Sequence, residues 1–269
     1  MHFMPTQVMD KVWAYFDAVG PLTGVAWPIA YREDEESRLA RLRSMGVRAF
    51  PSLLYPHKPA MAAWLNAWAA EFAGSHDDVL HTATFFPEPG VTDYVDEALA
   101  AGARIVKVHL QVGGFDPRDP LLDAVWGRLA ETGTPAVVHC GHGPAPGEFT
   151  GPEPFGEVLR RHPRLTAVIA HMGMPDYGSF LDLAERFDRV HLDTTMAFTD
   201  FSEQRAPFPA ELRSRLVELQ ERVLLGSDFP NTPYRYSHQL QALARLGLGD
   251  RWLRAVLHDN ATALLGLSD

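Results

Sequence analysis

The chain has 269 residues and a formal net charge of −10, and 46% of its residues are hydrophobic. This length suits one α/β barrel or two small domains, and the acidic charge excludes nucleic acid as the main partner, because phosphate backbones require clustered Lys and Arg. No run reaches the roughly 18 unbroken apolar residues of a membrane span, and the single cysteine, Cys140, excludes an internal disulfide framework. With no signal-like amino terminus, the chain is expected in the reducing cytoplasm.

From residue 34 onward, the sequence predicts helices that alternate with strands. Several of the predicted helices end at a glycine, the usual stop signal just beyond a helix. In chain order the predicted elements are helix Glu35–Ser44, strand Val47–Tyr55, helix Pro59–Ala73, strand Val79–Phe86, helix Thr92–Ala101, strand Arg104–Leu110, helix Leu121–Glu131, strand Ala136–His139, helix Phe155–Arg161, strand Thr166–His171, helix Ser179–Arg186, strand Val190–Thr194, helix Pro209–Leu219, strand Arg222–Ser227, and helices Pro233–Leu246, Arg251–Leu257 and Ala261–Leu265.

This alternation predicts βαβ units around a parallel sheet, as in a TIM-type (β/α)8 barrel. Seven strands follow residue 46, so an eight-stranded barrel lacks one, and its first strand is missing or displaced. The candidates for that strand are Gly24–Ile29 or a segment at or before residue 1. No linker, short repeat or low-complexity tract interrupts the pattern, which favours a single domain over residues 1–269.

Three strand ends carry side chains that can bind a metal. His139, His171 and Asp228 each follow a run of strand-forming apolar residues, and the carboxyl ends of parallel strands are where α/β barrels hold their chemistry. Imidazole and carboxylate groups suit one divalent ion, with zinc expected and manganese as the alternative. Such an ion polarises a substrate oxygen or lowers the pKa of a bound water. An unpaired Asp228 is costly to bury, so we expect it to bind metal, act as a base or accept a hydrogen bond.

Three further residues are candidate substrate contacts. Lys107 and His109 lie two apart on one predicted strand, so their side chains face the same way. A lysine within the apolar run of that strand needs a partner, such as a substrate carboxylate; alternatively it carries a carbamate that ligates metal. His109 is equally well explained as a structural residue. His142, in the Gly/Pro-rich loop after His139, carries the weakest signal of the three.

These motifs resemble the amidohydrolase superfamily, in the branch that includes aminocarboxymuconate semialdehyde decarboxylase. The likeness covers nearly the whole chain, from His2 to Leu267. The matching segments are His2-Phe3-Met4-Pro5, the single His139, the single His171, Gly226-Ser227-Asp228 and His258-Asp259-Asn260-Ala261.

The resemblance implies roles for individual residues. His139 and Asp228 would be metal ligands, with Asp228 also the general base. His171 would bind metal or polarise substrate or water. His2 would be the second histidine of a His-x-His motif, whose first histidine would lie directly before Met1. Lys107 falls where some superfamily members carry a carboxylated lysine, although this branch often lacks it, so a substrate contact is expected first.

The function expected from these residues is metal-dependent hydrolysis of a small organic molecule, at an amide, lactone or related bond. Water held by His2, His139 and Asp228 would attack, while His171 stabilises the developing oxyanion. One alternative is non-oxidative decarboxylation of a small unsaturated or aromatic carboxylic acid. A further alternative is a catalytically impaired barrel that lacks its first metal ligand. The expected partner is a small-molecule substrate rather than a nucleic acid or a membrane, and a homodimer is the simplest assembly.

Overall fold

The computed structural model describes residues 1–23 and 26–267. Six parallel strands form one sheet in the order β3-β4-β5-β6-β7-β8, and β1 pairs with β2 in parallel beside it. One residue separates β2 from β3, so the chain leads directly from the small sheet into the large one. The strands are β1 Phe50–Pro51, β2 Val79–Leu80, β3 Thr82–Thr84, β4 Ile105–His109, β5 Ala136–His139, β6 Ala167–Ile169, β7 Val190–Asp193 and β8 Val223–Leu224.

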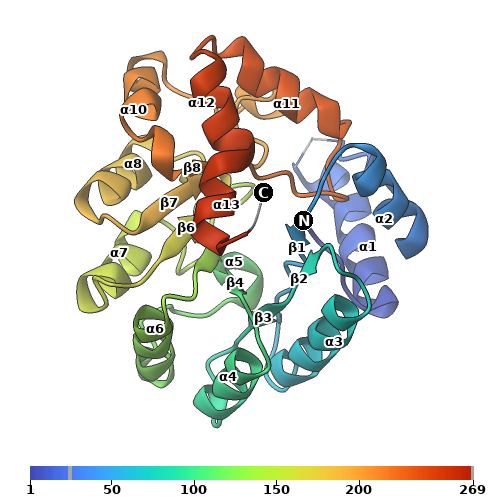
Figure 1. The fold of residues 1–269 in the computed structure, drawn as a ribbon, viewed down its shortest axis with the longest axis vertical. Coiled ribbons are helices and arrows are strands. Elements are labelled where there is room, and N and C mark those ends of the chain that lie inside the picture. Colours follow the sequence, from blue (N-terminus) through green and yellow to red (C-terminus); the bar gives the residue numbers. More distant parts are fainter. Residues whose placement is uncertain (24–25, 268–269) are drawn as a thin grey trace.

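Helices surround these strands, and the predicted α/β architecture of the TIM-barrel type is confirmed (Figure 1). Within residues 1–23 and 26–267, no helix is both long and apolar enough to cross a membrane. The helices are α1 Thr6–Thr23, α2 Glu35–Ser44, α3 Ala62–Gly74, α4 Val91–Ala100, α5 Leu110–Gly113, α6 Pro120–Thr132, α7 Pro152–Arg161, α8 Tyr177–Arg186, α9 Asp200–Glu203, α10 Arg213–Glu218, α11 Tyr236–Arg245, α12 Asp250–Arg254 and α13 Asn260–Leu265.

Most predicted helices are found within a few residues of their expected bounds, and β5 has its predicted bounds, but the other strands are shorter than predicted and α1 was not predicted at all. The predicted strand Val47–Tyr55 contains only the two-residue β1. An apolar run in the sequence marks residues that are buried, including residues just before and after a strand. Only the residues that pair with a neighbouring strand count as strand, so the observed strands are shorter than the apolar runs.

The strands bury an apolar face outward and turn polar residues inward. On β4, Val106 and Val108 belong to the core shared with the helices, as do residues of the neighbouring strands. Lys107 and His109 point to the other face, where the strand register places them beside Val137 and His139 of β5. Because paired residues in a parallel sheet face the same side, this register brings Lys107, His109 and His139 to the inner face, which nearer the amino ends is filled by an apolar cluster that includes Ile105 and Leu224.

Residues 1–3 bridge the two ends of the strand series, where the missing first strand was expected, although they are not themselves a strand. The N–H of His2 donates to the carbonyl of Phe229, 2.7 Å away, and the N–H of Leu53 donates to the carbonyl of Met1 at 2.8 Å. The Ser52 hydroxyl donates to the carbonyl of Phe3 at 2.9 Å. These contacts join the segment after β8 to the segment after β1. Of the other candidate, Gly24–Ile29, residues 24 and 25 lie outside the described residues and 26–29 are not strand.

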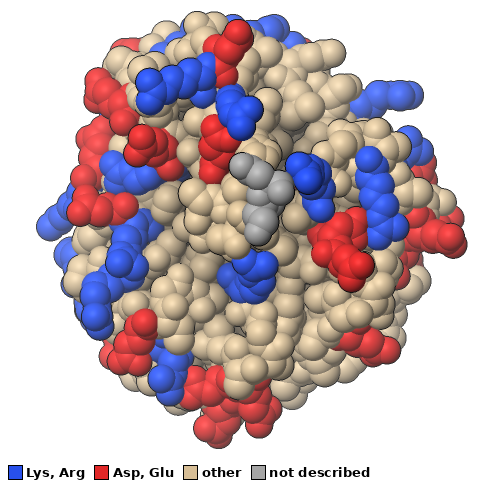
Figure 2. All heavy atoms as spheres, viewed as in Figure 1, with Lys and Arg blue, Asp and Glu red and all other residues tan. Residues whose placement is uncertain are grey.

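Helix α13 covers the amino ends of the strands. Its Leu264 packs against an inner cluster that includes Ile105 and Leu224, and the Asn260 amide donates to the carbonyl of Val223 at 2.7 Å. Arg104, directly before β4, donates to the carbonyl of Leu265. Figures 1 and 2 show this face, on which acidic and basic side chains lie interspersed around the edge. The opposite ends of the strands are left for the functional site.

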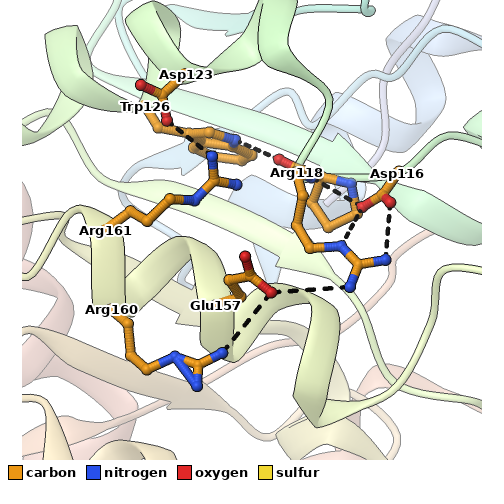
Figure 3. Close-up of polar contacts among 8 residues, drawn as sticks. Asp116, Arg118, Asp123, Trp126, Glu157, Arg160 and Arg161 are labelled. Atoms are coloured by element: carbon orange, nitrogen blue, oxygen red, sulfur yellow. Dashed lines mark hydrogen bonds and ion pairs between the residues drawn. The ribbon is translucent and has the colours of Figure 1, made fainter.

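The loop before α6 is fastened to α6 and α7 (Figure 3). The buried Trp126 indole N–H donates to the carbonyl of Pro117 at 2.8 Å. Arg118 pairs with Asp116 through two bonds of 2.8 Å, and its guanidinium lies 3.8 Å from Glu157. Exposed ion pairs contribute only about 0–1 kcal/mol each, so burial of Trp126 is the main stabilising element of this corner.

His191 lies on the inner face of the sheet in β7, paired with Val168. Its buried imidazole should make the stability of the protein depend on pH. Burial, followed by the positive charge of Arg222, lowers its pKa from the ordinary 6.5 to about 4. Between these values the unfolded chain binds a proton that the folded chain does not, so the free energy of unfolding falls as the pH falls. We expect His191 to account for a loss of about 2 kcal/mol between pH 7.5 and pH 5. Urea denaturation of wild type and His191→Gln checks this, and identical pH profiles would contradict it.

Candidate active site

A cavity of about 1160 Å³ opens at the carboxyl ends of the strands. Small-molecule sites typically measure roughly 300–1,000 Å³, so this cavity has room for a sizeable organic molecule. It lies where barrel enzymes hold their chemistry. Of the seven predicted site residues, His2 and Lys107 lie behind the cavity wall. The other five line the cavity: His109, His139, His142, His171 and Asp228.

His109 and His139 stack on each other at the ends of β4 and β5. Their ring centroids are 3.9 Å apart with an interplanar angle of 12°, as their direct pairing in the sheet requires. The Nε2 of His139 lies 2.8 Å from the carbonyl of Gly143. A carbonyl only accepts, so Nε2 carries the proton and the Nδ1 of the neutral ring keeps a free lone pair. Burial, assisted by neighbouring positive charges, lowers the pKa of both rings well below 6.5, which favours neutral imidazoles.

His171 lies beyond the end of its strand, which corrects the predicted strand Thr166–His171. β6 ends at Ile169, and the chain turns through a 3₁₀ segment in which His171 has a φ of 55°. The backbone N–H of His171 donates to Asp193 Oδ1 at 3.0 Å. Asp193 therefore holds this turn, and the His171 ring meets the His139 ring edge-on at 4.7 Å between centroids.

Asp228 and His2 form a close polar pair at the site. His2 Nε2 lies 2.8 Å from Asp228 Oδ1, and His2 Nδ1 lies 2.6 Å from the carbonyl of Leu53. Both contacts are donated only if the ring carries two protons. Burial, however, lowers the pKa of His2 despite its hydrogen bond to Asp228. A neutral ring donates to only one of these two partners, so with its proton on Nδ1 the Nε2 faces Oδ1 as a second acceptor. The pair thus lacks one positive charge, which a proton or a metal ion supplies.

The ionisation of Asp228 agrees with a pair that lacks one positive charge. Burial acts against its ionisation, but positive charge on His171, the close contact with His2 and the charge of Lys107 together hold the pKa of Asp228 well below its usual range. An ionised carboxylate beside imidazole nitrogens is a donor set that a divalent ion binds. Among the residues that the structure describes, no three His, Cys, Asp or Glu side chains already form a metal cage. The donors therefore suit an ion in their chemistry, whereas a ready cage is not formed.

Lys107 is buried, as its place on β4 predicts, with 3% of its surface exposed. Burial lowers its pKa, and the carboxylates of Asp193 and Asp228 counteract this shift. The positive charge of its ammonium group therefore interacts with the carboxylates of Asp193 and Asp228 on the inner face of the sheet. This position explains why a lysine is tolerated inside an apolar strand.

His142 lines the cavity, and its Nδ1 lies 2.6 Å from Asp176 Oδ2. The carboxylate fixes the direction of the ring, so His142 presents its other nitrogen away from Asp176. Its role as a substrate contact stays a prediction, as does that of His109.

Part of the cavity comes from segments that the sequence did not single out. α1 contributes Val8, Val12 and Tyr15, whose spacing of four and three residues places them on one helix face. Lys58 and Arg205 add positive charge at the mouth. The apolar periodicity of residues 8–16 could have indicated the helix, but no sequence motif indicates that its exposed side closes over an active site.

Comparison with known proteins agrees with this fold. The family model described as "Amidohydrolase" matches residues 1–267, and no similar sequence was found among curated proteins. A TIM-barrel protein from Bordetella bronchiseptica shares 20% identity at a TM-score of 0.72, covering 87% of this chain and 83% of that chain.

Two further solved structures also share the fold. A candidate 2-pyrone-4,6-dicarboxylic acid hydrolase from Pseudomonas putida has 19% identity and a TM-score of 0.61, covering 88% of this chain and 90% of its own. The apo form of IDCase from Metarhizium anisopliae has 17% identity and a TM-score of 0.60, covering 87% and 79%. The family match over nearly the whole chain and the strand-end site lead to one conclusion: the chain belongs to the amidohydrolase family and is an enzyme.

Proposed function

We propose that this enzyme hydrolyses an amide, lactone or related bond of a small organic molecule. The observation that carries the proposal is the His2–Asp228 pair, in which a carboxylate held ionised at the cavity wall lacks one positive charge. The Pseudomonas neighbour is described as a hydrolase of a pyrone dicarboxylic acid, which agrees with hydrolysis in this fold.

The chain's own residues divide the work of the reaction. Asp228 lines the cavity and accepts a proton from the attacking water, whose oxygen forms the new bond to the carbonyl carbon. His171, on the same cavity wall, stabilises the negative charge that develops on the carbonyl oxygen. The carbon–oxygen or carbon–nitrogen bond then breaks, and the proton passes from Asp228 to the leaving group. His2 keeps the Asp228 carboxylate in place, since its other nitrogen is bound to the carbonyl of Leu53.

One divalent ion, zinc or manganese, is part of this proposal. His2, His139, His171 and Asp228 are the residues that would hold it, and it would supply Lewis acidity and a more acidic water. A cytoplasmic location also belongs to the proposal, because the single cysteine, Cys140, is buried and free.

Metal removal and a substrate panel test the proposal. We expect chelator-treated enzyme to bind one Zn²⁺ per chain in calorimetry, and His2→Gln to lower that affinity by at least about tenfold. With Zn²⁺ or Mn²⁺ restored, wild type should hydrolyse members of a panel of aryl lactones, esters and anilides. An absence of metal binding would remove the ion from the proposal. Release of carbon dioxide from aromatic acids, without any hydrolysis, would favour the decarboxylase alternative.

A further inference from the structure

The lysines of this chain are concentrated at one place. Of its 24 basic residues, only Lys11, Lys58 and Lys107 are lysine, and the other 21 are arginine. Lys11 and Lys58 line the mouth of the cavity, and Lys107 lies on the inner face of the sheet, near Asp228. The chain as a whole has a net charge of −10, so positive charge gathered at the cavity contrasts with the overall balance.

The mouth carries two lysines that have no ion-pair partner in the described part of the chain. Lys11 and Lys58 are exposed, and within residues 1–23 and 26–267 neither forms an ion pair. Both lie close enough to His57 for their charges to act on it. Among the described lining residues, the one carboxylate is Asp228. Elsewhere arginines are commonly paired, as Arg43 is with Asp78 and Arg128 with Asp96.

Four aromatic side chains in contact with one another form an aromatic wall of the same cavity. Tyr15 contacts Phe16 at 5.8 Å between ring centroids, Phe16 stacks on Trp27 at 5.0 Å, and Trp27 meets Phe201 edge-on at 4.9 Å. The guanidinium of Arg205 lies 5.4 Å from the centre of the Phe201 ring. All five side chains line the cavity. Aromatic faces of this kind bind a flat apolar group, and Arg205 adds a cation at the end of the wall.

We propose that the mouth binds the carboxylate of an amphiphilic organic acid through Lys11 and Lys58, while the flat part of the acid lies along this aromatic wall. The inference rests on the proposed function, in which a different group of the same molecule is cleaved at Asp228. The cavity volume of about 1160 Å³ leaves room for both groups at once. The lysines thus determine specificity without taking part in the bond cleavage.

Binding of a matched pair of probes tests this inference without requiring turnover. The probes are 2-naphthoate and its uncharged analogue 2-naphthamide, measured by calorimetry on metal-loaded enzyme. We expect wild type to prefer naphthoate, and Lys11→Gln and Lys58→Gln each to weaken naphthoate binding roughly three- to tenfold. Binding of naphthamide should not change. Lys58→Arg keeps the charge and should retain the preference.

The control is Arg251→Gln, which removes the same charge from an exposed residue of α12 that does not line the cavity. It should leave the binding of both probes unchanged. Equal affinity for the two probes, or equal loss of affinity in the lysine variants and in Arg251→Gln, would overturn the inference. A preference for naphthoate without hydrolysis of any panel member would instead count against the proposed function alone, so the two failures are distinguishable.

Discussion

Replacing Asp228 by Asn is expected to lower kcat/KM by roughly 10²- to 10⁴-fold while the protein stays folded. The amide has the shape of the carboxylate and keeps an oxygen for the contact with His2, which is 2.8 Å in the wild type. It carries no charge and accepts no proton at neutral pH, so it cannot serve as the base. Steady-state kinetics on the best substrate of the panel, together with circular dichroism, measure the two effects separately.

A matched substitution excludes a general effect of charge. Asp250→Asn makes the same change at an exposed residue in the first turn of α12, and we expect wild-type kinetics from it. Wild-type turnover in Asp228→Asn would show that the reaction does not depend on this carboxylate. An equal loss in both variants would point to net charge rather than to the site.

The second large effect is expected from Gly226→Ala, which should lower the free energy of unfolding by about 3 kcal/mol. A Cβ at this position would lie 1.9 Å from Thr195 Oγ1 and 2.5 Å from Asp193 Oδ1. Both residues are buried, and Asp193 Oδ1 accepts the backbone N–H groups of His171 and Thr195, so this carboxylate cannot move without losing hydrogen bonds. Because one of these bonds holds His171, a displaced carboxylate would disturb the site as well. Urea denaturation and kinetics measure both consequences.

Gly74→Ala is the control for this substitution. Gly74 is the last residue of α3, and a Cβ there would meet nothing within 4 Å. We expect its stability to change by less than about 1 kcal/mol. If Gly226→Ala unfolds at the same urea concentration as wild type, the close approach of this backbone to Asp193 is not what requires glycine.

Local sequence patterns predict much of the fold and the place of the site. Helix α2 and strand β5 have the bounds that glycine stops and apolar runs indicate. His139, His171 and Asp228 gather at one cavity, because parallel strands bring their carboxyl ends to the same side. That inference needs only the order of strands and helices along the chain.

The remaining features depend on contacts between distant segments. The position of residues 1–3 beside Leu53 and Phe229 follows from backbone hydrogen bonds that no local pattern encodes. The role of Asp193 depends on a turn 22 residues earlier in the chain, where His171 has a left-handed φ. The cationic mouth combines α1 with the loop that carries Lys58. Each of these features is decided by which segments become neighbours in space.

The fate of the oxygen atom of water tests the proposed chemistry most directly. Wild-type enzyme should turn over the best substrate of the panel in H₂¹⁸O, with mass spectrometry of the product and measurement of carbon dioxide. Water activated at Asp228 predicts one ¹⁸O atom in the new carboxyl group for each turnover and no carbon dioxide. Release of carbon dioxide with an unlabelled product would contradict hydrolysis at this site.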